Sequence, residues 1–150
     1  MSEPDPVPRR RPSPTGHGQV PVLAAVALGG GLGSAARYGA LRLWPVPAHA
    51  FPWTTLAVNA VGCALIGVLM VTVTEGRRPA HRLVRPFLGT GVLGGFTTFS
   101  TYTQDTERLL SAGRAAPALV YLAGTLAAAL AAVWLASAAT RRLLVPRRLS

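Results

Sequence analysis

Polar side chains are scarce in the long apolar runs of this sequence, so those that do occur are the first candidates for chemistry. One run carries Asn59 about six residues from its start, and the amide of this residue offers two donors and one acceptor. Another run contains Gly89–Thr103, GTGVLGGFTTFSTYT, with four glycines, six Ser/Thr hydroxyls and three aromatic rings. Amide N–H groups, hydroxyls and the positive edges of aromatic rings all attract anions. The pattern indicates a polar route for a small anion, and the alternative is that these groups only join helices inside a membrane protein.

The polar groups of the second of these runs occur at helical spacing. Phe99 and Tyr102 are three residues apart and share one helix face, whereas Ser100 and Thr101 lie on adjacent faces. Ring edges and hydroxyl donors solvate an anion without a fixed positive charge, and conduction requires binding that is weak enough for the ion to leave. The alternative is that the two rings fill a helix interface.

The pair Gly94-Gly95, followed by Thr97 and Thr98, is expected to open this helix, because glycine loosens helical backbone. Irregular backbone at membrane depth is tolerated only where it is buried in protein or lines a cavity. Carbonyl groups freed at such a break coordinate cations. A packing kink is the alternative.

Arg37 is the only charged residue inside an apolar run. A charge at membrane depth costs about 3 kcal/mol on insertion scales unless it is paired or hydrated. Three roles are open: Arg37 lines a vestibule for anions, caps the carbonyl groups of a helix, or extends its side chain to the nearer membrane surface.

Four apolar segments are long enough to cross a bilayer, which requires about 20 mostly apolar residues. These segments are Val20–Leu43, Trp53–Thr74, Pro86–Gln104 and Ala115–Thr140. We therefore expect an all-α integral membrane protein with four transmembrane helices, the third of them broken. The membrane domain is expected over residues 20–141, between a Pro/Arg-rich tail at 1–19 that is disordered by composition and a basic tail at 142–150.

These four segments leave no room for a separate catalytic domain. Beyond the N-terminal tail, carboxylates occur only at the ends of the apolar segments, as Glu75, Asp105 and Glu107. No Ser/His/Asp set shares a segment. An enzymatic function is therefore not expected.

All fifteen basic residues are arginine, and the net charge is +10. Such a charge also suits nucleic-acid binding, but here the arginines lie at the ends of the apolar segments, where they act as topology signals. With four spans, the two tails and the loop Glu75–Arg85 share one side of the membrane and carry eleven arginines, whereas the opposite side carries three. The excess predicts a multi-pass protein of the cell membrane with both termini in the cytoplasm.

The sequence resembles the CrcB/Fluc family of fluoride channels in three motifs. They are GGGLGSAARY at Gly29–Tyr38, TLAVNAVG at Thr55–Gly62 and GTGVLGGFTTFSTYT at Gly89–Thr103. The likeness covers nearly all of the chain after the tail. It implies an antiparallel dimer of four-span subunits, with two fluoride pores and a structural sodium ion (Na+), itself not transported, on the twofold axis.

The resemblance also implies roles for individual residues. Main-chain carbonyls of Gly94 and Thr97 from each subunit would hold the sodium ion, Asn59 would donate to fluoride, and the ring edge of Phe99 would face it. The other residues of the fluoride pathway would be Ser100, Thr101, Tyr102, Tyr121 and Thr125, with Arg37 in the vestibule. Tyr102 departs from the phenylalanine that is usual in the family, and its hydroxyl either leaves conduction intact or narrows one pore.

Three functions are compatible with the sequence. The first is a fluoride-specific channel that exports fluoride passively from the cytoplasm and lowers its toxicity. The second is an obligate partner subunit of a heterodimeric fluoride channel, because a chain that inserts in both orientations needs balanced arginines. The third is a small four-helix secondary exporter, which would require a membrane-embedded carboxylate that these segments lack.

Overall fold

The computed structural model describes residues 19–47, 50–76 and 79–144, and this part of the chain is helical, without strands. The all-helical prediction is therefore confirmed for the described residues. Three of the helices are long and apolar enough to cross a membrane: α1 (Val20–Leu43), α2 (Trp53–Glu75) and α5 (Ala115–Leu144). Most of the two predicted tails, 1–19 and 142–150, lies outside the described residues.

Proline and glycine mark the ends of the first two long helices. Pro21 lies in the first turn of α1. Backbone N–H groups there have no helical partner, so the N–H that proline lacks costs no hydrogen bond. α1 ends at Leu43, two residues before Pro45, because proline disfavours helical backbone in the residue before it. Pro52 directly precedes α2, which ends at Glu75 because the backbone of Gly76 is extended (φ −65°, ψ 147°).

The third apolar segment is not a continuous α-helix. It begins with η2 (Arg85–Leu93), which is wound as a π-helix, and continues in the single turn α3 (Gly94–Phe96). At Thr97 the backbone becomes extended (φ −73°, ψ 154°), and helix resumes only in α4 (Ser100–Ser111). The opening therefore follows the Gly-Gly pair, whose two residues remain helical.

A short turn joins α4 to α5. α4 extends to Ser111, a few residues past the predicted end of the third segment. Gly113 has φ +72°, a left-handed conformation that glycine adopts without strain. α5 then begins at Ala115, with Pro117 in its first turn.

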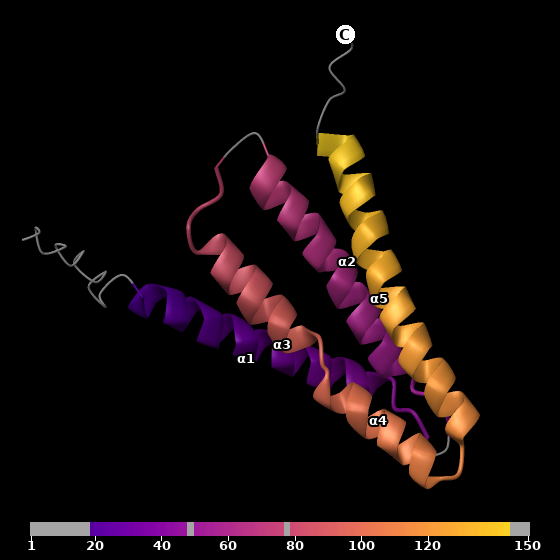
Figure 1. Cartoon of the computed structure of the whole chain (residues 1–150). Helices are drawn as coiled ribbons and strands as arrows, with labels where there is room; N and C mark the ends of the chain where they lie inside the picture. Colours follow the sequence, from indigo (N-terminus) through magenta and orange to yellow (C-terminus); the bar gives the residue numbers. More distant parts are fainter. Residues whose placement is uncertain (1–18, 48–49, 77–78, 145–150) are drawn as a thin grey trace, which may run out of the picture.

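The helices pack as two pairs that diverge from the end where α4 lies (Figure 1). α1 lies along η2 and α3, and α2 lies along α5. α2 also contacts η2 and α3, so the two pairs meet along it. α4 packs on the first part of α5 and joins the pairs at their common end.

The pair of α1 with η2 and α3 packs backbone against backbone. A Cβ atom added to Gly33 of α1 would collide with the Val92 carbonyl oxygen. From the other side, a Cβ atom added to Gly95 would collide with the Gly30 carbonyl oxygen. Small residues allow this close approach, which is how helices associate where lipid provides no hydrophobic drive between them.

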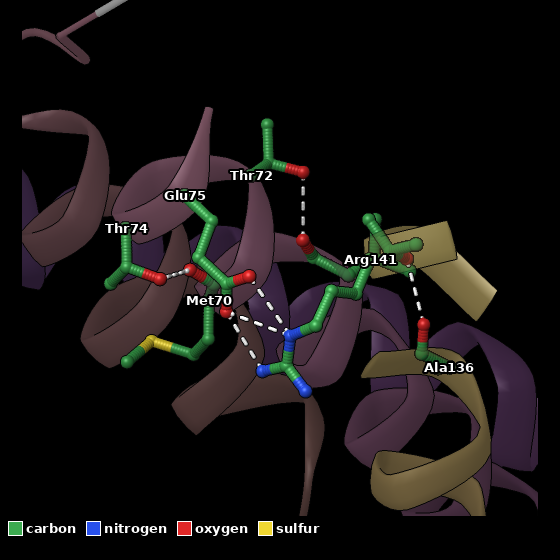
Figure 2. Close-up of polar contacts among 8 residues, drawn as sticks. Met70, Thr72, Thr74, Glu75, Ala136 and Arg141 are labelled. Atoms are coloured by element: carbon green, nitrogen blue, oxygen red, sulfur yellow. Dashed lines mark hydrogen bonds and ion pairs between the residues drawn. The ribbon is translucent and has the colours of Figure 1, made fainter. Parts of the chain in front are cut away.

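The pair of α2 with α5 is joined at its far end by an ion pair. Arg141 donates from Nε and Nη2 to the Glu75 carboxylate at 2.8–3.0 Å (Figure 2). The Arg141 side chain is 56% exposed and that of Glu75 32% exposed, and ion pairs this exposed contribute little stability. The contact shows that the C-terminal ends of α2 and α5 lie side by side.

A small apolar core lies where α4 meets α5. Leu109, Ala118 and Tyr121 are buried there at 0–1% exposure. The residues packed around them are Phe51, Leu56 and Tyr102. Many large apolar side chains elsewhere in the described residues are exposed, which suits helices that face lipid.

Candidate functional site

Asn59 of α2 contacts the break between α3 and α4 at residues 97–99, which we call the interruption. Asn59 is 9% exposed, and its amide faces the backbone of Thr98. Asn59 Nδ2 donates to the Thr98 carbonyl at 3.0 Å, and the Thr98 N–H donates to Asn59 Oδ1 at 2.8 Å. The interruption is therefore stabilised by a side chain from another helix, which is the helix-joining role that the sequence left open for Asn59.

The carbonyl groups of Gly94 and Thr97 lose their helical partners at the interruption. In a continuous α-helix the Thr98 N–H would bond to the Gly94 carbonyl, and the Thr101 N–H to the Thr97 carbonyl. Instead the Thr98 N–H binds Asn59, and the Thr101 N–H binds Thr98 Oγ1 at 3.1 Å. Main-chain oxygens of this kind are the ligands that hard cations prefer. The backbone at Gly94 and Thr97 thus suits the sodium ion that the family resemblance assigns to them.

Arg37 caps the helical stretch that ends at the interruption. Its Nε donates to the Gly95 carbonyl at 3.1 Å, and the Ser34 hydroxyl donates to the same oxygen at 3.4 Å. A cation near the C-terminal end of a helix interacts favourably with its unpaired carbonyls. Of the three roles open for Arg37, this geometry is that of the cap, and its place in an anion vestibule stays a prediction.

Hydroxyl groups continue from the interruption into α4. Thr98 Oγ1 donates to Thr101 Oγ1 at 3.1 Å and lies 3.3 Å from Ser100 Oγ. Thr98 is buried, Thr101 is half-buried and Ser100 is exposed. The predicted residues Ser100 and Thr101 are thus brought together in a hydroxyl row, with Thr98 at its centre.

Aromatic rings run beside the hydroxyl row. The ring centroids of Phe99 and Tyr102 are 5.8 Å apart, and those of Tyr102 and Tyr121 are 5.3 Å apart. Phe99 is 79% exposed, whereas Tyr121 is fully buried. The Tyr102 hydroxyl donates to the Leu122 carbonyl of α5 at 3.0 Å. This bond directs the hydroxyl towards α5 and ties α4 to that helix.

A pocket of about 420 Å³, the central pocket, lies between α2, the interruption and α5. Four residues of the predicted fluoride pathway line it, namely Asn59, Phe99, Tyr102 and Thr125. Thr125 is 5% exposed, and its Oγ1 has no hydrogen-bond partner within the described part of the chain. A buried hydroxyl without a partner costs roughly 1–3 kcal/mol, which an anion or a water molecule in the pocket would offset.

The predicted pathway residues do not all meet in the central pocket. Ser100, Thr101 and Tyr121 are not part of its lining. The Tyr121 hydroxyl instead donates to Asp105 Oδ2 at 3.4 Å. Thr101 lines a second pocket, and the hydroxyl row connects the two.

The second pocket, of about 230 Å³, lies where α4 passes the end of α1 and the start of α2, and we call it the α4 pocket. Its polar lining consists of Thr54, Thr55, Thr101, Asp105 and Arg108. Asp105 Oδ2 accepts a bond from Thr55 Oγ1 at 2.6 Å, and Asp105 Oδ1 lies 3.2 Å from Arg108 Nη2. Sequence reasoning missed this cluster. The available signal was the spacing of Thr101, Asp105 and Arg108, four and then three residues apart, which places them on one helix face.

Known proteins are similar in sequence to this chain over most of its length. The chain matches the family described as CrcB-like protein, Camphor Resistance (CrcB), over residues 24–137. It is 67% identical over 126 residues to the fluoride-specific ion channel FluC 1 of Streptomyces coelicolor, covering 84% of this chain and 81% of that protein. Two proteins of Streptomyces avermitilis are also similar to this chain. The fluoride-specific ion channel FluC 2 of this organism is 64% identical over 132 residues (88% and 83% covered), and its FluC 3 is 50% identical over 126 residues (84% and 61% covered).

Proposed function

This chain belongs to the CrcB family, and on that premise we propose that it is a fluoride-specific ion channel that lets fluoride leave the cytoplasm passively and so lowers its toxicity. The observation that carries the proposal is the interruption at residues 97–99. There, uncharged donors and aromatic rings from three helices line one pocket of an otherwise apolar molecule. The protein acts as a channel and not as an enzyme.

The central pocket suits the chemistry of fluoride. This ion is small and strongly hydrated, so a pathway has to replace its water with other donors. Asn59 keeps one Nδ2 hydrogen beyond the one donated to Thr98, and Thr125 presents a buried hydroxyl. Phe99 and Tyr102 add ring edges, which are positive. None of these groups carries a formal charge, so the ion is held weakly enough to move on.

Passive movement through this pathway requires no coupling to ATP or protons. A membrane potential that is negative inside favours the exit of an anion by about 2.3 kcal/mol per 100 mV. The hydroxyl row from Thr98 to Thr101 provides the next donors after the central pocket.

In the membrane, η2, α3 and α4 would together form the third of four spans, between α2 and α5 in chain order. The interruption lies against Asn59, the seventh residue of α2, so its irregular backbone would be buried in protein as membrane depth requires. Eleven arginines on the side of the two tails and the loop Glu75–Arg85, against three on the other, support cytoplasmic termini.

The complete channel would be an antiparallel dimer with a structural sodium ion on its axis. Gly94 is exposed on the surface of the subunit, where a second subunit can reach its carbonyl. The Gly94 and Thr97 carbonyls of two subunits would give the ion four oxygen ligands. Its charge would hold the two interruptions together without taking part in conduction.

Efflux from vesicles tests the function. Purified protein is reconstituted in liposomes loaded with fluoride, with sodium present and a potassium ionophore to balance charge, and released fluoride is read with an electrode. We expect fluoride efflux faster than a carrier achieves, and no efflux from liposomes loaded with chloride instead. The proposal fails if fluoride stays inside under these conditions or if chloride escapes as fast.

A heterodimeric channel is the second candidate, and the arginine imbalance favours it. A chain that inserts in both orientations needs similar positive charge on both sides of the membrane, whereas this chain carries eleven arginines against three. Streptomyces avermitilis has two proteins that match this chain, so one organism can hold two such subunits. Accessibility of tags placed at both ends distinguishes the cases: a single orientation supports the heterodimer, and equal populations of both exclude it.

A secondary exporter has less support. Such a protein needs a carboxylate that binds a cation or proton within the membrane. Asp105 is bonded to Thr55, the third residue of α2, and faces Arg108, so it lies near the start of α2 and is already paired.

A further inference from the structure

The α4 pocket is lined by Arg108, a half-buried cation that the proposed pathway leaves without a role. Arg108 Nη2 lies 3.2 Å from Asp105 Oδ1, yet Arg108 Nε and Nη2 are buried and make no hydrogen bond within the described residues. We propose that Arg108 binds a small anion in the α4 pocket and forms the outer site of the fluoride pathway. This inference rests on the proposed function.

The Asp105 carboxylate does not cancel such a site, because its oxygens are already engaged. Oδ2 accepts bonds from the Thr55 hydroxyl at 2.6 Å and from the Tyr121 hydroxyl at 3.4 Å, and Oδ1 faces Arg108. The Asp105 side chain is 13% exposed, against 35% for that of Arg108. The carboxylate therefore holds the guanidinium in place, and the five N–H groups of the guanidinium leave donors for a second acceptor.

The α4 pocket continues from the hydroxyl row. Thr101 lines this pocket and accepts a hydrogen bond from Thr98, which lines the central pocket. An anion that leaves the central pocket passes from Thr98 to Thr101 and then meets Arg108. Without Arg108, the same anion meets the negative charge of Asp105, which repels it.

The chemistry of the site predicts affinity without selectivity. A guanidinium stays charged and offers fixed N–H donors to any small anion. Selection of fluoride then belongs to the uncharged donors of the central pocket, and bromide becomes a usable probe of the α4 pocket.

Fluoride efflux from vesicles tests the role of Arg108. For Arg108→Gln we expect the half-saturating fluoride concentration to rise at least tenfold, and for Arg108→Lys we expect a smaller rise, because the charge remains. Arg42→Gln is the matched control, because Arg42 is an exposed arginine between Leu41 and Trp44, which line the α4 pocket, and does not line it itself. It is expected to leave the half-saturating concentration unchanged.

The outcomes separate the inference from the function on which it rests. If the unsubstituted protein conducts and Arg108→Gln behaves like Arg42→Gln, Arg108 binds no anion and the inference is wrong. If the unsubstituted protein conducts no fluoride, the proposed function is wrong instead.

A second measurement needs no transport. Trp44 lines the α4 pocket, and the chain has three tryptophans, so Trp53→Phe with Trp134→Phe leaves Trp44 as the single fluorophore. Titration of this variant with bromide is expected to show a saturable quenching component that Arg108→Gln removes, in protein that elutes as the same species from a sizing column. A saturable component that survives Arg108→Gln, or that is absent beforehand, would overturn the site.

Discussion

The two helix pairs of this molecule are held together by opposite means. Between α1 and η2, glycines bring main chain against main chain: a Cβ atom on Gly29 would collide with the Phe87 carbonyl oxygen, as one on Gly33 would with that of Val92. Between α2 and α5, only Gly67 comes this close, to the Val133 carbonyl oxygen, and an exposed ion pair joins the ends. Side chains can change rotamer to absorb a substitution, whereas main chain at contact distance cannot.

The difference shows which pair fixes the site. The interruption at residues 97–99 continues directly from the glycine-packed pair, so its position along the membrane is set by rigid main-chain contacts. The helix pair opposite, α2 and α5, supplies Asn59 and Thr125 to the same pocket. Substitutions in the two pairs should therefore differ in size, and the comparison can be tested in order of expected effect.

Substitution of Gly33 by valine is expected to have the largest effect. The added side chain has to displace the Val92 carbonyl, and overpacking of this kind costs typically about 1–3 kcal/mol, or more where main chain is in the way. We expect loss of most folded protein, read as the sizing-column profile and the thermal midpoint in detergent, and loss of fluoride efflux.

Gly31→Ala is the control for this variant, since a Cβ atom there meets nothing within 4 Å. Alanine favours helix over glycine by about 1 kcal/mol, so the midpoint should stay or rise. Equal loss of folded protein in both variants would mean that glycine on α1 is needed for some reason other than close packing.

Asn59→Ala is expected to rank second and to act on the site more than on the fold. It removes both hydrogen bonds to the Thr98 backbone and leaves that N–H and carbonyl unpaired, at a cost of roughly 1–3 kcal/mol. Efflux should fall at least tenfold, while the protein remains folded. Thr74→Ala, on the same helix, removes only a hydroxyl bonded to its own helix at the Met70 carbonyl and should conduct normally (Figure 2).

Tyr102→Phe is expected to keep the channel open. The ring remains beside Phe99, and the variant loses only the hydroxyl bond to the Leu122 carbonyl, which contributes about 1 kcal/mol. The thermal midpoint should fall slightly and fluoride efflux should persist. Complete loss of efflux would show that the hydroxyl itself serves the ion.

Arg141→Gln is expected to have the smallest effect of all. It breaks the ion pair with Glu75 at the C-terminal ends of α2 and α5, where neither side chain is buried. The thermal midpoint should match that of the unsubstituted protein at both low and high salt. A large drop at low salt would mean that the α2–α5 pair depends on this contact and is less adaptable than its side-chain packing indicates.

The sequence predicted the features that depend on residues close together in the chain. Prolines and the apolar runs predicted where α1, α2 and α5 lie. Residue types within the second and third runs predicted Asn59, Phe99 and Tyr102, the family resemblance added Thr125, and the structure gathers all four in one pocket. Their roles in fluoride movement stay predictions. The opening itself was attributed to Gly94-Gly95, but these residues remain helical, and Gly95 packs against α1.

What the sequence could not show depends on contacts between distant segments. The interruption is held by Asn59, 39 residues away in the chain from Thr98, and no local pattern reports such a bond. The α4 pocket likewise combines residues from the end of α1, the start of α2 and the middle of α4. Arg108 therefore looked like a topology signal at a segment end until its neighbours were known.

The π-helical winding of η2 sets the direction in which the interruption faces. The Gly94 N–H bonds to the Gly89 carbonyl five residues earlier, so this segment holds more residues per turn than an α-helix. Each residue of an α-helix advances the chain by about 100° around the axis. If the winding of η2 stayed unchanged, removal of a single residue from it would turn everything downstream by somewhat less than that angle, carrying Thr98 away from Asn59. The wide π-helical turn therefore sets the angle at which the interruption faces α2, so the length of η2 is constrained as well as the residues that follow it.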